Sequence, residues 1–548
     1  MAIDSPVPGR RTGGVGIPRP WLFWAGVVMT TVGVALHLPG FYQMRGMGYQ
    51  MAGMPMPTSM TVGMVLLVIG VIAAIAGLVQ RAPLPEAAAA AANYQVRAGS
   101  SDKLNPAQIR LICALSLALV IDIMKPATLA FILPGLRQEY HISVADSSSL
   151  PVVALTGTVV GSLTWGYLGD RIGRRATVLL SSVLFIATTV CAVMPTFTWN
   201  LVMCFMMGAA AGGLLPVAYA MMAESVPAGR RGFIMVLQAG LATVLAYFAT
   251  SGLAAWLIPH FGWRIMWFTH FPFALLILLL NRWIPESPRF LVQYGQISEA
   301  ARVVDVYGME LVTTAYERPG ERAAAKVSGR SALVALFGRQ GLGRTLVVGL
   351  YALSWGCVNW GFMTYVPTLL KNSHSLHSSG STLLFYSSIL AIPGTALVAF
   401  FYARWSSRKA MALYGAITAA ALLLMAATDL RGGKVVTVLS LMLLIAGSSG
   451  VVAMLAPYTA EVYPTEIRSV GSGFAAACSK SGGMFGPPAL AAVLAAFPGV
   501  RVISLIVAAP MVLATLAIGL KGRETVGRDL EEVDETPMSL ALAAVEIE

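Results

Sequence analysis

Charged residues are scarce in this chain of 548 residues. Asp, Glu, Lys and Arg make up only 11% of it, whereas a soluble globular domain carries about 25%. Hydrophobic residues reach 57%, and the mean hydropathy is +0.73. This composition excludes an ordinary soluble protein and predicts an all-α protein that crosses a membrane many times.

Nucleotide-binding motifs are absent from the sequence, and cysteines are few. No phosphate-binding G-x-x-x-x-G-K-S/T and no Ser/His/Asp arrangement occurs, so neither a primary pump nor an enzyme is indicated, and we expect no cofactor or metal ion. The five cysteines lie within apolar runs and form no C-x-x-C pair, which predicts small buried residues rather than disulfides or zinc ligands. They are Cys113, Cys191, Cys204, Cys357 and Cys478.

The positive charge of the chain indicates topology rather than a polyanion site. The net charge is +12, but the basic residues are dispersed among short loops, mostly on one side of the expected spans. This side is therefore expected to be cytoplasmic and to hold both termini, and no nucleic acid partner is expected.

No small-x-small cleavage site follows the first apolar run, so no cleavable signal peptide is expected.

Fourteen apolar runs are long enough to span a bilayer. They are arranged as a leading pair followed by six and six. The expected segments are a disordered N-terminus (1–20), a transmembrane hairpin with a methionine-rich outer loop (21–80), a linker (81–108), a first six-helix bundle (109–284), a cytoplasmic loop (285–344), a second six-helix bundle (345–520) and an acidic tail (521–548).

The six-plus-six part repeats itself. Ala223–Pro227, with Arg231 four residues later, resembles Ala460–Pro464, with Arg468 four residues later. Each copy carries a glutamate, Glu224 in the first and Glu461 in the second. Such a repeat predicts two structurally related halves.

One basic loop is unusually rich in glycine. It reads Gly166-Tyr167-Leu168-Gly169-Asp170-Arg171-Ile172-Gly173-Arg174-Arg175 and lies between two apolar runs. A generic positive-inside loop would explain its arginines but not its glycine spacing or its aspartate. The pattern G-x-L-x-D-R-x-G-R-R resembles the loop between the second and third helices of the major facilitator superfamily. The second half contains an incomplete copy of this loop pattern, which retains Arg404.

Three further segments carry the same resemblance. The first is Pro285–Leu291, which resembles P-E-S-P-R-x-L. The second is the Pro464–Gly482 region, which resembles P-T-x-x-R…G-x-G…R-x-G, with Lys480 at the last basic position. The third is Glu524–Glu532, which resembles E-T-x-G-x-x-L-E-E. The resemblance implies two pseudo-symmetric bundles with a binding site between them near the middle of the membrane. It also implies a cytoplasmic gate. Its residues would be Gly166, Asp170, Arg171, Gly173, Arg174, Arg175, Glu224, Arg231, Arg404, Glu461 and Arg468.

The first helix of the core is similar to that of the aromatic acid/proton symporters. Their pattern D-G-x-D…F-x-x-P-x-L matches Asp122 at the first acid and Phe131–Leu136 beyond it. Lys125 replaces the second acid. The sugar-porter signature Q-Q-x-S-G is absent from the seventh helix of the core, which disfavours a sugar substrate.

Asp122 and Lys125 are the charges most expected to act in transport. They are three residues apart on one predicted helix and therefore share a face. A charge in the bilayer needs a partner or a cavity. The pair could be a purely structural ion pair. Alternatively, Asp122 exchanges a proton while Lys125 binds an anionic substrate.

Five other residues are candidates for the substrate site. Lys480 would add a cation from the second half, and the remaining four would bind a small planar ligand through aromatic rings and amides. Packing and a structural lysine are the competing explanations. The four residues are Gln238, Trp355, Asn359 and Trp360.

The methionines of residues 41–60 allow two interpretations. Thioethers bind Cu(I), but methionine also fills irregular apolar gaps. The leading pair lies outside the family resemblance and is expected to be a peripheral hairpin.

The residues together favour a proton-coupled symporter that acts as a monomer. Its substrate would be a small organic metabolite, either anionic or aromatic. The symporter would reside in a bacterial inner membrane. Efflux by proton antiport and a membrane sensor or copper-handling protein are the alternatives.

Overall fold

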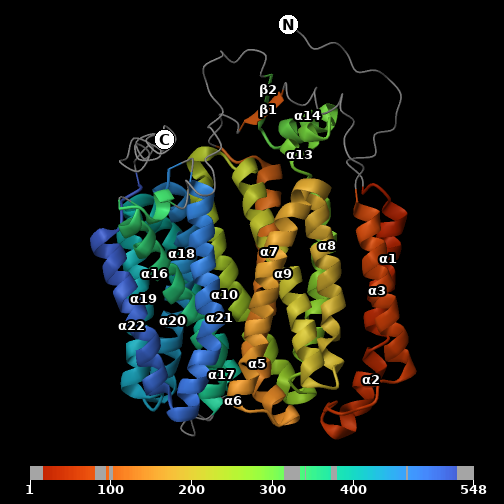
Figure 1. Cartoon of the computed structure of the whole chain (residues 1–548), viewed down its shortest axis with the longest axis vertical. Coiled ribbons are helices and arrows are strands. Elements are labelled where there is room, and N and C mark those ends of the chain that lie inside the picture. The colour runs from red at the N-terminus through yellow and green to blue at the C-terminus, as the bar shows by residue number, and fades with distance from the viewer. Residues whose placement is uncertain are drawn as a thin grey trace.

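A computed structural model of the chain shows a bundle of long helices that stand roughly parallel (Figure 1). Thirteen of the described helices are long and apolar enough to cross a membrane. This confirms the expected all-α polytopic fold. The structure describes residues 17–79, 94–97, 103–313, 334–339, 341–371, 379–464 and 467–526.

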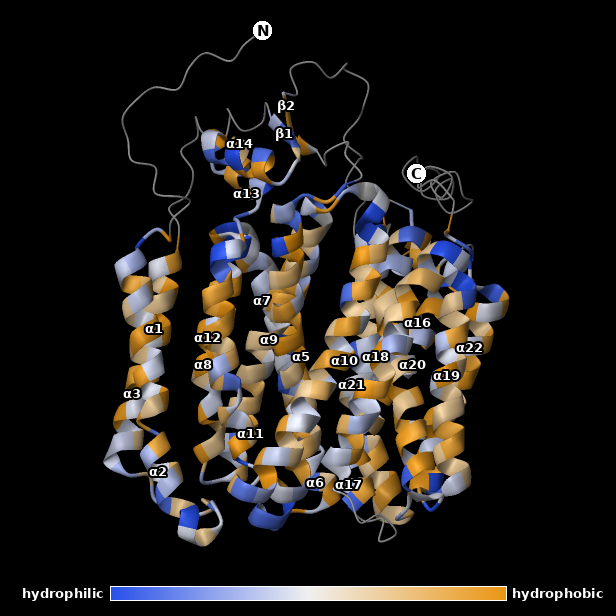
Figure 2. Ribbon diagram, turned by 180° about the vertical axis from the view of Figure 1, so that it is seen from behind, coloured by the Kyte–Doolittle hydropathy of each residue, from blue (hydrophilic) through white to orange (hydrophobic). Residues whose placement is uncertain are grey.

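One expected span is less apolar than predicted. It is α21, Arg468–Ala496, whose 29 residues would still extend about 43 Å at the helical rise of 1.5 Å per residue. Its glycines, serines and Lys480 lower its hydropathy, so it is not among the thirteen. Figure 2 shows that elsewhere the spans are largely apolar and the polar residues gather at their two ends.

The leading hairpin is a tightly packed helix pair. Its helices α1 (Pro20–Ala35) and α3 (Thr58–Leu78) are joined by α2 (Leu38–Gln43) and η1 (Met44–Met47). A Cβ on Gly26 would lie 2.5 Å from the Gly70 oxygen, so only glycine allows this approach. Small residues at helix contacts are typical of membrane proteins.

Six spans form the first half of the core. Its long helices pack mainly on one another, with α7 and α9 in the most extensive contact. The elements are α5 (Pro106–Tyr140), α6 (Val144–Ser147), α7 (Ser149–Ile172), α8 (Arg174–Ala187), η2 (Thr188–Val193), α9 (Phe197–Ser225), α10 (Ala228–Phe261), α11 (Ile265–Phe268), α12 (His270–Leu280) and η3 (Asn281–Trp283).

The second half repeats this plan with two π-helical turns. The halves meet where α10 packs on α18 and α20, α7 on α21, and α5 on α17. The elements besides α21 are α16 (Leu342–Gly356), the π-helix η5 (Cys357–Phe362), α17 (Met363–Lys371), α18 (Gly380–Phe400), the π-helix η6 (Phe401–Trp405), α19 (Ser407–Thr428), α20 (Gly433–Val462) and α22 (Val500–Lys521).

A small domain covers one end of the bundle, where the chain also enters α1 and leaves α22 (Figure 1). We call this end the basic end, because it carries the arginine-rich loop of residues 166–175, and the opposite end the far end. The domain holds α13 (Pro288–Gln293) and α14 (Ile297–Val306). It also holds a two-stranded antiparallel sheet, β1 (Tyr94–Arg97) with β2 (Glu310–Thr313), which the sequence analysis did not predict.

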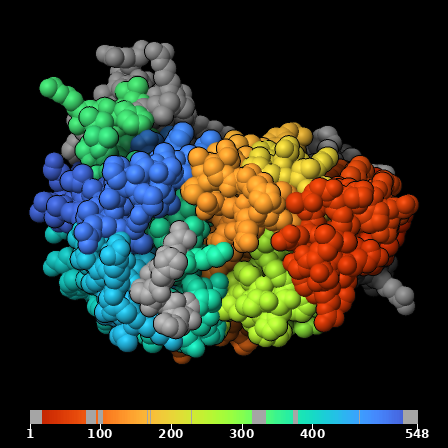
Figure 3. All heavy atoms as spheres, turned by 90° about the horizontal axis from the view of Figure 1, so that it is seen from below, coloured from red at the N-terminus to blue at the C-terminus, as the bar shows by residue number. Residues whose placement is uncertain are grey.

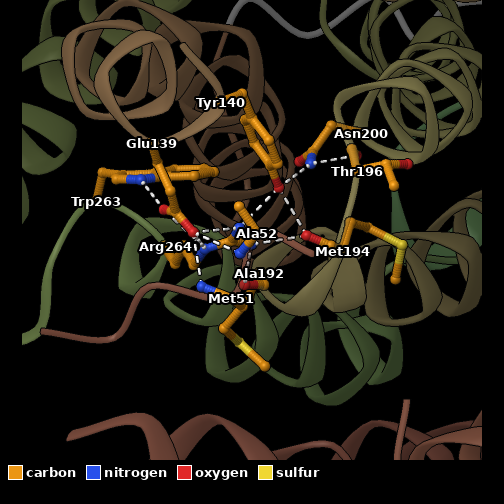
Figure 4. Close-up of polar contacts among 10 residues, drawn as sticks. All are labelled: Met51, Ala52, Glu139, Tyr140, Ala192, Met194, Thr196, Asn200, Trp263 and Arg264. Carbon is orange, nitrogen blue, oxygen red and sulfur yellow. Dashed lines mark hydrogen bonds and ion pairs between the residues drawn. The ribbon is translucent and has the colours of Figure 1, made fainter. Parts of the chain in front are cut away.

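A buried carboxylate organises the far end of the first half (Figure 4). Glu139, near the end of α5, forms an ion pair of 2.7 Å with Arg264 and accepts a hydrogen bond of 2.8 Å from the Trp263 indole. Arg264 also donates to the carbonyl oxygens of Ala192 and Met194, each at 3.0 Å. We call these contacts the far-end clamp. It joins α5, η2 and the α10–α11 turn.

The far-end clamp also holds the leading hairpin. The backbone N–H groups of Met51 and Ala52 donate to Glu139 at 2.6 and 3.0 Å, and Gly53 donates to the Pro195 carbonyl at 2.9 Å. The hairpin also packs on α8. Figure 3 shows it at the far end, against one side of the molecule. It is thus peripheral to the core but bonded to the first half.

Replacing Glu139 by glutamine should lower the stability of the protein strongly, because Arg264 would stay buried without a counter-charge. Removing one partner of a buried ion pair costs about 3–5 kcal/mol. Thermal unfolding of the purified variant measures the loss. Glu299→Gln is the matched control, because its ion pair with Arg302 is solvent-exposed, and such pairs contribute at most about 1 kcal/mol. Equal melting temperatures for the two variants would contradict the clamp.

Candidate functional site

Asp122 and Lys125 form a buried ion pair in the middle of α5. The Asp122 Oδ1 to Lys125 Nζ distance is 3.5 Å, and the two side chains are 6% and 2% exposed. Pro126 and Leu129, one turn further along the same face, line a cavity of about 20 Å³. The charged pair therefore lies about one helical turn to the basic side of this cavity.

The cavity lies between the two halves of the core. Trp360 and Thr364 line it from the second half, and α5, α7 and α9 line it from the first. Its volume matches about one water molecule, so the halves are closely packed around it. The residues of α7 and α9 that line it are Pro151, Ala154, Leu155, Thr158, Met207, Gly208 and Ala211.

Lys480 places a second cation at a similar depth in the core to the Asp122–Lys125 pair. Its Nζ donates a hydrogen bond of 2.7 Å to the Ser162 hydroxyl of α7, which links the two halves. Ser162 lies one turn to the basic side of Thr158, which lines the cavity. Lys480 thus contacts α7 one turn from the cavity, whereas the Lys125 ammonium is directed at the Phe185 ring of α8.

The seventh helix of the core is interrupted by η5. Trp360, within η5, lines the cavity. Asn359 accepts a hydrogen bond of 3.3 Å from the Tyr247 hydroxyl of α10, whereas the Trp355 indole donates to the Ser448 carbonyl at 2.9 Å. Trp355 is therefore engaged in packing within the second half, and Trp360 is the member of this group that faces the cavity.

Gln238 is a buried amide without a partner. It is 4% exposed, and neither its Nε2 nor its Oε1 has a hydrogen-bond partner among the described residues. An unsatisfied buried polar group costs about 1–3 kcal/mol, and such groups need an explanation. Gln238 lies on α10, nine residues before Tyr247 and toward the basic end.

Two residues near the charged pair were missed by the sequence analysis. The Lys125 ammonium lies 3.1 Å from the centroid of the Phe185 ring of α8. His270 of α12 lies beside it, with its Nε2 3.1 Å from the Thr128 hydroxyl. A lone histidine in an apolar run was the available signal for His270. Nothing in the sequence distinguishes Phe185 from other buried phenylalanines.

A cluster of carboxylates joins the elements at the basic end. Glu224 pairs with Arg174 at 2.6 Å and accepts a hydrogen bond of 2.9 Å from the Ser287 hydroxyl. Glu286 accepts the backbone N–H groups of Arg174 and Arg175 at 2.7 and 3.2 Å, which caps the N-terminus of α8. Burial raises the pKa of Glu286 in spite of these donors.

The glycine at the start of α8 has a structural reason. Gly173 has a φ of +98°, which favours glycine, and a Cβ there would collide with the Glu286 carboxylate. Gly166 and Asp170 lie in α7, but the surroundings of both residues fall outside the described part of the structure. The predicted contact between Asp170 and Arg174 or Arg175 therefore stays a prediction.

The second half has a matching cluster at the basic end. Glu461 accepts hydrogen bonds from Tyr402 and Thr525 at 2.7 and 2.6 Å. Glu524 accepts the N–H of Ser407 at 2.8 Å and so caps α19. Burial acts to raise the pKa of Glu524, but hydrogen bonds from Ser406 and Ser407 outweigh it and lower that pKa overall.

The arginines of the predicted gate differ in their surroundings. Arg404 is exposed, whereas Glu461 accepts its hydrogen bonds from Tyr402 and Thr525. The predicted role of Arg404 in the gate stays a prediction. Arg231 donates to the Val226 carbonyl at 3.4 Å. Arg171 lies 4.4 Å from the ring centroid of Tyr167. For Arg468, the buried Nε and Nη2 have no hydrogen-bond partner among the residues that the structure describes.

Several methionines of the leading hairpin take part in apolar packing. Within the described ranges, no group of three or more His, Cys, Asp or Glu residues could hold a metal ion, and all five cysteines are free. Met51 and Met60 are buried in the apolar core at 2% and 1% exposure. His37 is directed at the Gly33 carbonyl, with its Nδ1 at 2.7 Å.

Comparison with known proteins identifies the family. The model of the Major Facilitator Superfamily matches residues 115–487. This chain belongs to the major facilitator superfamily. It is an integral membrane protein of a family of secondary transporters, not an enzyme, and the leading hairpin precedes the matched segment.

Several transporters of this superfamily resemble the chain over most of their length. The niacin transporter NiaP of Acinetobacter baylyi is 28% identical over 77% of this chain and 95% of its own. The 4-hydroxybenzoate transporter PcaK of Pseudomonas putida is 26% identical over 76% and 92%. The inward-open xylose transporter XylE of E. coli has the same fold, with a TM-score of 0.61 at 18% identity over 78% and 99%.

Neutralising the basic-end glutamates should slow transport without preventing folding. Glu224→Gln and Glu461→Gln each lose charge-assisted hydrogen bonds, so we expect uptake rates to fall about tenfold. Initial uptake rates in proteoliposomes measure the effect, with Glu299→Gln as the control that leaves both clusters intact. Wild-type rates in both cluster variants would show that these contacts do not govern the conformational change.

Proposed function

We propose that this major facilitator imports a small aromatic or other organic acid together with protons. The observation that carries the proposal is the buried Asp122–Lys125 pair beside the cavity between the halves. A charged pair inside the membrane is costly unless it serves a pathway or a structural need. The chain would act as a monomer in a bacterial inner membrane, with its basic end in the cytoplasm, as the positive-inside rule favours.

The proposed substrate class rests on four groups within the spans of the core, of which Trp360 lines the cavity. Lys125 and Lys480 offer two cations to a carboxylate, Trp360 offers an aromatic face, and Gln238 offers an unsatisfied amide. A small planar acid matches this combination better than a sugar, which needs many hydroxyl partners. The relatives named for niacin, 4-hydroxybenzoate and gallate transport accept ligands of this kind.

Coupling would arise from competition for Lys125. In the protein without substrate, the Lys125 ammonium donates a hydrogen bond to Asp122. A substrate carboxylate that binds Lys125 takes over as its counter-ion, and two anions then surround one cation. Protonation of Asp122 relieves this repulsion, so the substrate and one proton are bound together. The halves then rock about the site and release both on the other side.

Single and double variants test this coupling. In proteoliposomes, Lys125→Met should weaken the binding of niacin or 4-hydroxybenzoate about tenfold or more, because the carboxylate loses its counter-charge. Asp122→Asn should abolish accumulation driven by a pH gradient, while exchange of labelled for unlabelled substrate continues. Binding, exchange and accumulation are measured for both variants and for the double variant.

Melting temperatures separate a loss of function from a loss of folding. Each single variant leaves a buried charge without its ion-pair partner, whereas the double variant leaves no buried charge at this pair. If the double variant accumulated either probe as well as wild type under a pH gradient, the pair would be structural and the coupling proposal would be wrong.

A further inference from the structure

The Lys125 ammonium has two partners, and the closer one is a ring. Its Nζ is 3.1 Å from the centroid of Phe185 and 3.5 Å from Asp122 Oδ1. Both Lys125 and Phe185 are 1% exposed. The contact is therefore shielded from water, which is the setting in which a cation over an aromatic face is most strongly stabilised.

The ion pair is long for a buried contact. A charge-assisted hydrogen bond from nitrogen to a carboxylate usually measures about 2.7–2.9 Å, as the Arg264–Glu139 pair does at 2.7 Å. The ring contact lies well inside the usual limit of about 6 Å. The ammonium thus lies closer to the Phe185 ring of α8 than to the Asp122 carboxylate.

The surroundings contain one other titratable group. His270 of α12 interacts with Lys125, and its ring centroid lies 5.5 Å from that of Phe185. Its Nε2 is directed at Thr128 rather than at Asp122. Asp122, Lys125 and His270 are the titratable groups that interact here among the described residues.

We propose that Phe185 is a positioning residue that holds the Lys125 ammonium off Asp122 and so keeps Asp122 open to protonation during transport. This inference rests on the proposed proton coupling. If Lys125 settled fully on Asp122, the carboxylate would bind a proton less readily. When Asp122 is protonated, the ammonium loses its anion, and the ring face stabilises it until a substrate carboxylate arrives.

A series of fluorinated phenylalanines at position 185 tests the proposal. Each added fluorine weakens the negative face of the ring with little change in volume, so the fold is preserved. The pH of half-maximal uptake of 4-hydroxybenzoate should move stepwise to lower pH, by about one pH unit over the series. Phe185→Leu, which removes the ring, should show the same shift. The same substitutions at Phe23, buried in the leading hairpin, are the control and should leave the profile unchanged.

The outcomes separate this inference from the proposed function. Wild-type uptake without any pH dependence would overturn the proposed coupling itself. A pH-dependent wild type whose profile does not move along the fluorine series would overturn the role of Phe185 alone. A lower melting temperature in Phe185→Leu without a shifted profile would likewise show that the ring only fills space.

Discussion

A charge inside the membrane must have a partner, and the first half of the core has such pairs at three levels. Glu139 and Arg264 are 2.7 Å apart at the far end, and Glu224 and Arg174 are 2.6 Å apart at the basic end. The pair in the middle, Asp122 and Lys125, is the loosest at 3.5 Å. The two ends are thus closely bonded, whereas the charge pair in the middle is held less closely. That middle level is also where the cavity lies.

The close bonding at both ends has a mechanical consequence. The far-end clamp joins α5, η2, the α10–α11 turn and the leading hairpin, and Tyr140 extends it to Asn200 of α9 (Figure 4). At the basic end, Glu286 ties the start of α8 to the segment before α13. Helices fixed to one another at both ends move together, as rocking of one half against the other requires. Since Met51 and Ala52 take part in the clamp, the hairpin is bonded to the same half.

Local patterns in the sequence predicted the spans, the superfamily and the two halves, because each depends on short runs of neighbouring residues. The glycine loop was recognised from its pattern. The structural reason for its glycine was not, because Glu286, which caps α8, lies 112 residues further along the chain. Glu139 and Arg264 are 125 residues apart, and each alone resembles an ordinary charge at a helix end. The contact of the Phe185 ring with Lys125 could not be predicted from the sequence either, because only tertiary packing brings α8 against Lys125. The β1–β2 pair joins two segments that both looked like linkers.

The two halves share an architecture but not their central residues. The first helix of the first half carries Asp122 and Lys125, whereas the first helix of the second half carries Trp360 within a π-helical turn. A π-helical turn inside an α-helix frequently marks a functional site. In the proposed mechanism, the first half binds the carboxylate and the proton, and the second half contacts the ring of the substrate. A ligand that carries both a charge and an aromatic face would then bridge the halves, whereas one with only one of these features would leave one half without a partner.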